Sequence, residues 1–184
     1  MYAVKEKELY VVLSQTGTIL SRILKFLTRA EYNHASVSLD PTLNTMYSFG
    51  RIFAYYPFWG GFVKESKNFG TFKRFSRAKI LVLAIPVSDD KYDLIEKHLN
   101  NMYNHRKKYG YNYLGLYLAA LHINHKSKNR FYCSEFVKDV LIKFGLTESD
   151  FFSAAITQPA HFIGLPDANL VYKGELDALN NLHN

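Results

Sequence analysis

Apolar and polar residues alternate strictly from His34 to Asp40, the clearest pattern along the chain. Because successive side chains of a strand point to opposite faces of a sheet, this alternation predicts a β-strand. The core-facing residues are Ala35, Val37 and Leu39, and the residues of the polar face are His34, Ser36, Ser38 and Asp40. Turn-forming residues at 41–44 then predict a hairpin whose second arm spans 45–50.

Other apolar patterns predict further strands and helices. Continuous apolar runs predict strands at 9–13, 79–87 and 169–172. Apolar residues at three- and four-residue spacing predict helices at 19–29, 91–105, 111–122 and 134–144. The first helix should be capped by Thr16 or Thr18, the second by Ser88 or Asp89, and the last should end at Gly145.

The segment 51–79 follows neither period. It mixes aromatic residues with lysines and arginines, and Gly60, Gly61 and Gly70 interrupt it. We expect loops with short strands here, in a position to form a flap over a site. Interleaved rings and cations suit stacking on single-stranded nucleic acid or contact with a lipid interface. The alternative is a segment that packs its rings beneath and exposes its charges to solvent.

Length and composition indicate a single domain. With 184 residues the chain can bury a hydrophobic core, and we assign 1–176 to the domain and 177–184 to a polar C-terminal tail. The single cysteine excludes an intrachain disulfide. Residues 1–8 lack the apolar region of a secretory signal, and the longest nearly apolar run, 113–123, is too short to span a bilayer. We therefore expect a soluble, cytoplasmic protein.

The charge and the aromatic content narrow the classes of partner. A formal net charge of +7 indicates a surface that attracts anions, whether nucleic acid, anionic lipid headgroups or an acidic substrate. Fourteen tyrosines and fourteen phenylalanines suit a deep core or an apolar, lipid-facing cleft. Charge alone does not choose among these partners, and it does not make nucleic acid obligatory.

Cys133 stands where the helix at 134–144 should begin. At that end, unpaired backbone N–H groups and the positive pole of the helix dipole favour an anion, so the thiol pKa should fall. The same N–H groups, with Tyr132 and Ser134 beside the thiol, can line the cleft and hold the oxyanion that forms when a thiolate attacks a carbonyl. The alternative is a cysteine that serves only as a small buried hydrophobe.

A cysteine nucleophile needs a base to take its proton. His34 is the candidate among the seven histidines, because it lies at the end of a strand whose other face is committed to the core; an ordinary strand-end histidine is the alternative. His122 and His125 have a spacing that can ligate a metal, but no carboxylate or thiol joins them. We expect no metal and no cofactor.

Two blocks of sequence carry a resemblance to a known family. A strand that ends at Gln15, a helix, and the Tyr-Asn-His block at 32–34 are followed much later by the Tyr-Cys-Ser-Glu-Phe-Val block at 132–137. This order resembles the permuted NlpC/P60 papain-like superfamily, in particular its YiiX-like branch, in which the histidine strand precedes the cysteine helix. The resemblance implies an α+β, circularly permuted papain-like fold with an antiparallel sheet packed against helices that include the cysteine helix. It also implies a thiol hydrolase with Cys133 as nucleophile and His34 as base.

The residue that orients His34 is less plainly marked. The family often places a polar residue on the strand after the histidine, where this chain offers Ser48, a neutral partner for an imidazolium. Asp40 has the charge but lies six residues along the strand from His34, roughly 20 Å away. Gln15 matches a strand-end glutamine that lines the cleft or donates to the oxyanion in that branch; a plain turn residue is the alternative.

The sequence therefore predicts a cysteine peptidase or amidase that cleaves an amide bond of a small peptide or related substrate through a thioester. The first alternative is a thiol acyl hydrolase or acyltransferase that acts on a lipid at a membrane surface. The second is a non-catalytic basic module that binds nucleic acid or peptide. The sequence does not define the oligomeric state.

Overall fold

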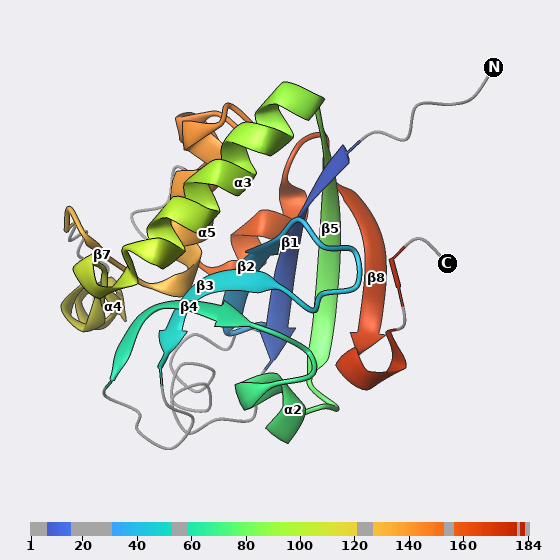
Figure 1. Cartoon of the computed structure of the whole chain (residues 1–184), viewed down its shortest axis with the longest axis horizontal. Helices are drawn as coiled ribbons and strands as arrows, with labels where there is room; N and C mark the ends of the chain where they lie inside the picture. Colours follow the sequence, from blue (N-terminus) through green and yellow to red (C-terminus); the bar gives the residue numbers. More distant parts are fainter. Residues whose placement is uncertain are drawn as a thin grey trace.

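The computed structural model describes residues 7–15, 31–52, 59–120, 127–152, 157–179 and 181–182. It is an α+β structure built on one sheet with the strand order β7-β6-β4-β3-β2-β1-β5-β8 (Figure 1). Neighbouring strands are antiparallel except β6 and β7, which are parallel. The strands are β1 (Lys7–Gln15), β2 (His34–Ser38), β3 (Met46–Arg51), β4 (Gly60–Glu65), β5 (Lys79–Val87), β6 (Gly110–Tyr111), β7 (Arg130–Phe131) and β8 (Asn169–Glu175).

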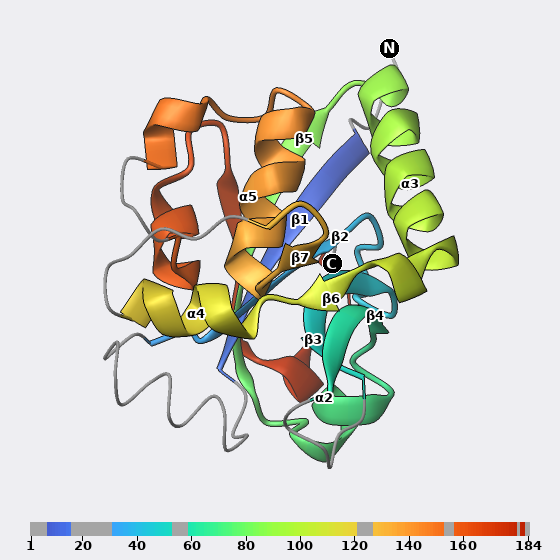
Figure 2. The same cartoon turned by 90° about the vertical axis from the view of Figure 1, so that its left-hand side faces the viewer.

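Two helices cover one face of this sheet. Figure 2 shows α3 (Asp89–Asn104) and α5 (Cys133–Lys143) side by side in front of the strands. Their buried residues, such as Leu99 and Val140, pack with the odd-numbered side chains of β1 into the larger hydrophobic core. The remaining helical elements are α2 (Gly70–Arg74), α4 (Tyr113–Ala120) and the 3₁₀ helices η1 (Arg106–Lys108), η2 (Ser149–Phe152), η3 (Pro159–Gly164) and η4 (Leu176–Ala178).

The opposite face of the sheet, which carries the polar residues of β2, is also buried. Phe72 of α2 and Leu176 of η4 pack there with the even-numbered side chains of β1 into a second core. Ser36 and Ser38 are fully buried on this face. Ser38 satisfies its hydroxyl by donating to the Thr45 carbonyl oxygen at 2.7 Å.

The C-terminal segment is likewise not a purely polar tail. Leu179, which we assigned to that tail, is only 5% exposed and belongs to the second core. The Lys67 ammonium donates to its carbonyl oxygen at 3.0 Å, and the Leu182 N–H donates to Pro41. This segment covers the second face because the apolar side chains of β1 and β5 on that face need a second layer.

Most of the predicted elements are confirmed within the described residues. The strand at 79–87, the hairpin of β2 and β3, and the helices α3 and α5 form where their periodicity predicts them, and Gly145 follows α5 with φ of +60°. The segment 51–79 contains β4 and α2. β2 ends two residues early, because the Asp40 carboxylate accepts backbone N–H bonds within the turn.

Two predictions fall outside the described residues: the helix at 19–29, and the histidine pair His122 and His125. None of the described helices is long and apolar enough to cross a membrane.

Candidate active site

Cys133 is the first residue of α5, as its place in the sequence predicts. Tyr132 precedes it in an extended conformation, and the Glu135 carboxylate accepts the Tyr132 backbone N–H at 3.3 Å. This bond satisfies a backbone group at the helix start and fixes the direction in which the chain enters α5. Cys133 is 5% exposed, so the sulfur is largely shielded from bulk water.

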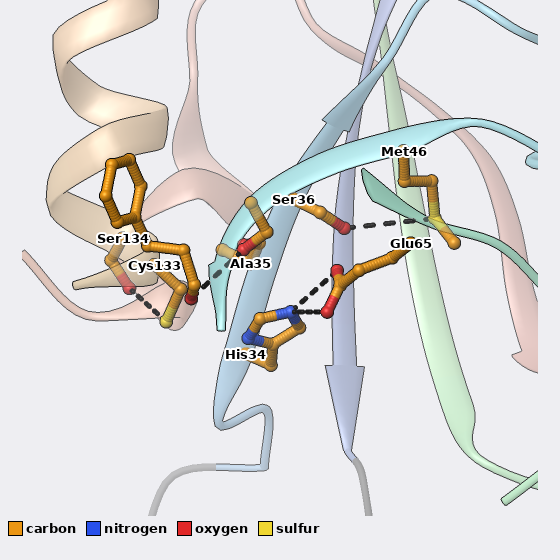
Figure 3. A network of polar contacts seen from close by, with 9 residues as sticks. His34, Ala35, Ser36, Met46, Glu65, Cys133 and Ser134 are labelled. Carbon is orange, nitrogen blue, oxygen red and sulfur yellow. Dashed lines mark hydrogen bonds and ion pairs between the residues drawn. The ribbon is translucent and has the colours of Figure 1, made fainter. Parts of the chain in front are cut away.

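His34 connects this sulfur to a carboxylate. It is the first residue of β2, and its Nε2 lies 2.9 Å and 3.1 Å from the two carboxylate oxygens of Glu65, the last residue of β4. The His34 side chain also lies close enough to Cys133 for each group to shift the pKa of the other. Figure 3 shows the imidazole between the two groups, with its second nitrogen, Nδ1, on the side of the sulfur. Both His34 and Glu65 side chains are 15% exposed.

The electrostatics of the three groups favour an ion pair. Burial by itself would lower the pKa of His34, but the charge of Glu65 and the hydrogen bonds to Cys133 and Glu65 outweigh it and raise that pKa well above the ordinary value. Burial would likewise raise the pKa of Cys133. Hydrogen bonds and charge from His34, helped by the Ala35 N–H and the Ser134 hydroxyl, reverse this and lower the pKa of the thiol. Both shifts favour a thiolate beside an imidazolium.

The backbone of Ala35 holds the sulfur in place. β2 and β3 pair at Val37 and Tyr47. Two residues before Val37, the Ala35 carbonyl oxygen accepts the Ser48 hydroxyl at 2.8 Å, and the Ala35 N–H helps to lower the pKa of the Cys133 thiol. The sulfur therefore lies beside the strand that carries His34.

This geometry corrects the role predicted for Ser48. The residue is fully buried, and its hydroxyl donates to Ala35 rather than accepting from His34. The carboxylate beside His34 is that of Glu65, on β4, one strand beyond β3. This carboxylate lies near Gly50 of β3, where a Cβ would be 3.3 Å from Oε1 of Glu65 and 3.8 Å from Cε1 of His34.

A signal for Glu65 was present in the sequence. It is the only aspartate or glutamate between Asp40 and Asp89, in a segment rich in lysine and arginine. The lysines and arginines of this segment are enough to keep its surface soluble. A single carboxylate among them therefore indicates a specific partner and not only a solvated charge.

The other predicted site residues lie at different distances from the Cys133 sulfur. Ser134 is buried with its Oγ 3.9 Å from the Cys133 sulfur. Tyr132 is buried. Gln15 ends β1 one residue beyond Ser14, which pairs with His34, so Gln15 lies at the same end of the sheet. The contacts of the described residues include none between Gln15 and Cys133.

Tyr111 lies near the thiol and is not among the site residues that the sequence predicts. Tyr111 of β6 is buried close enough to Cys133 to feel its charge. Burial, followed by that charge, raises the pKa of Tyr111 well above its ordinary value, so the group stays a neutral phenol. It therefore adds no charge near the thiol.

The described residues contain no group of three or more histidine, cysteine, aspartate or glutamate side chains arranged to hold a metal ion. No protein-family model matches the sequence, and a search of curated proteins gives no significant match.

Proposed function

We propose that this protein is a cysteine hydrolase in which Cys133 is the nucleophile, His34 the general base and acid, and Glu65 the residue that orients His34. The observation that carries the proposal is the position of one imidazole between a carboxylate at 2.9 Å and the only cysteine of the chain, at a helix start. A nucleophile, its base and a third group that orients the base are the parts that covalent catalysis requires.

The geometry supports a two-step reaction at a carbonyl carbon. The Cys133 thiolate attacks the carbonyl, and N–H groups at the start of α5 stabilise the oxyanion. The tetrahedral intermediate collapses as His34 gives its proton to the leaving amine, which leaves a thioester on Cys133. His34 then takes a proton from water, the resulting hydroxide attacks the thioester, and the acid is released with the thiolate restored. Glu65 keeps Nε2 occupied and stabilises the imidazolium in both steps.

The substrate class that we propose is an amide, as in a small peptide. The permuted papain-like relationship that the sequence blocks indicate is compatible with an α+β fold in which the cysteine helix packs on a mixed sheet and the histidine strand comes earlier in the chain. The chemistry would serve a lipid ester or amide equally well, because the nucleophile meets a carbonyl carbon in each case.

A non-catalytic module is less well supported by the site. The sequence offers only the neutral Ser48 as a partner for His34, whereas the structure places the charged Glu65 within hydrogen-bonding distance of it. A histidine with a purely structural role in a binding module does not require a carboxylate beside one ring nitrogen and a thiol beside the other.

The test is the rate of Cys133 alkylation by iodoacetamide as a function of pH. We expect the wild-type thiol to react with a pKa below the ordinary value of about 8.5, and the His34→Ala variant to return to that value or above it. Cys133→Ala is the blank, since the chain has no other thiol. An unperturbed wild-type pKa that is unaffected by His34→Ala would overturn the proposal.

A further inference from the structure

Three large apolar side chains are strongly exposed around one part of the surface. Ile52 is 50% exposed, Trp59 67% and Phe69 72%. The Ile52 N–H donates to the Trp59 carbonyl oxygen at 2.9 Å, which brings the first two together. Single exposed apolar residues are common, but a group of large ones at one place marks an interaction surface.

These side chains stand at two adjoining pockets. One pocket, of about 280 Å³, is lined by Ile52, Phe69 and Glu65 among others. The second, of about 560 Å³, is lined by Ile52, Trp59 and Tyr103 among others. The two share Ile52, Val63 and Lys64, so they adjoin along β4. The surface therefore borders the carboxylate side of the proposed active site.

Cations without acidic partners surround the second pocket. The Lys64 ammonium lies 4.6 Å from the centroid of the Tyr103 ring, and the Arg106 guanidinium carbon lies 4.7 Å from the same centroid. Lys107 completes the lining. Within the part of the chain that the structure describes, no ion pair joins these three cations to a carboxylate. Two positive charges held at one ring favour an anion between or beside them.

Positive charge is also concentrated in the segments of the chain that line the second pocket. The segments 41–88 and 97–134 supply both walls of the second pocket, and together they carry fourteen lysines and arginines against one acid, Glu65, for a charge of +13. The rest of the chain carries nine lysines and arginines against fifteen acids, for a charge of −6. The one acid of the basic segments is already bonded to His34.

We propose that the surface formed by Ile52, Trp59, Phe69, Lys64, Arg106 and Lys107 docks on an anionic lipid bilayer. Apolar side chains enter the region between headgroups and acyl chains, where tryptophan is favoured, while lysine and arginine meet the anionic headgroups. Single-stranded nucleic acid would use the cations and rings but gives no reason to expose the aliphatic Ile52. This inference goes beyond the thiol chemistry and does not depend on it.

Trp59 reports directly on this surface, because it is the only tryptophan of the chain. Its emission should shift to shorter wavelength with vesicles of phosphatidylcholine mixed with phosphatidylglycerol, and should not shift with phosphatidylcholine alone. Binding should weaken as salt is added, because the cations are exposed and their attraction is screened. An equal response to both kinds of vesicle, or no response to either, would overturn the proposal.

Variants measured by vesicle co-sedimentation complete the test. Lys64→Gln and Arg106→Gln should each lower the partition coefficient by about fivefold, and Trp59→Ala should lower it further by removing the apolar anchor. The matched controls Leu170→Ala and Lys173→Gln change exposed residues of β8, at the opposite edge of the sheet, and should bind as wild type.

The outcomes separate this inference from the proposed reaction. Cys133→Ala should bind vesicles normally, whereas Lys64→Gln should keep the wild-type rate of alkylation. Equal losses in the β8 controls and in the variants of the proposed surface would show non-specific adsorption and refute a defined face. A shift of Trp59 emission with a single-stranded oligonucleotide, without one for anionic vesicles, would refute the lipid partner in favour of nucleic acid.

Discussion

Replacing Glu65 by glutamine tests the electrostatic part of the site in isolation. The amide has nearly the same shape as the carboxylate, and its oxygen can still accept the Nε2–H of His34. Only the negative charge is lost. The variant therefore asks whether Glu65 stabilises an imidazolium or merely holds a neutral ring in position.

The structure sets the size of the expected effect. Two unit charges 2.9 Å apart attract each other by about 6 kcal/mol at an effective dielectric constant of about 20, which is an upper bound. A carboxylate next to a cation commonly shifts a pKa by about 1 to 3 units, which corresponds to about 1.4 to 4 kcal/mol. We expect Glu65→Gln to lower the pKa of His34 by an amount in this range. The thiolate should become less populated to a similar extent, because its proton must reside on His34.

The assay is the alkylation rate of Cys133 near neutral pH, together with thiolate absorbance as a function of pH. The rate should fall by at least roughly tenfold in Glu65→Gln. Ser48→Ala is the matched control: it leaves the buried Ala35 carbonyl without its hydrogen bond, so it should lower the free energy of unfolding by about 1 to 3 kcal/mol, with a smaller effect on alkylation. The reasoning is refuted if Glu65→Gln alkylates like wild type, or if Ser48→Ala has the larger effect on the thiol pKa.

Three further variants or titrations test other parts of the structure. Gly50→Ala should slow alkylation, because its Cβ would lie 3.3 Å from the Glu65 carboxylate and displace it, whereas Gly164→Ala has room and should react normally; equal rates in both would contradict the geometry. Phe136→Ala should lower the free energy of unfolding in urea by about 3 to 5 kcal/mol, because the ring is buried against Phe49 and Phe62; a loss under about 1 kcal/mol would show that it is not core. His98, which lies beside Lys143, has its pKa lowered to about 4, by burial first and by the lysine charge second. Stability from this group should therefore be fully present above the ordinary histidine pKa of about 6.5 and be lost as the pH falls towards 4, since the unfolded chain binds the proton first. An NMR titration of His98 with a midpoint near 6.5 would contradict this.

The sequence by itself determined the local elements and the position of the thiol. The strands β2 and β5 and the helices α3 and α5 follow from periodicity, which depends only on how side chains repeat along a strand or a helix. The place of Cys133 at a helix start follows in the same way, from the apolar positions after it and Gly145 at the far end. Its approach to His34 was predicted from a resemblance and from strand parity, and the structure brings the two side chains into contact.

Only the tertiary structure decided which groups complete the site. Glu65 is 31 residues from His34, and their contact depends on the order of β2, β3 and β4 and on a side chain that extends along the sheet. Ser48 is on the face that parity predicts, but the backbone of Ala35 takes its hydroxyl. The second layer over the sheet also buries the serines of β2, which the alternation of the sequence places only on a polar face. Periodicity reports which way a side chain points, whereas its partner is set by register and by what packs above it.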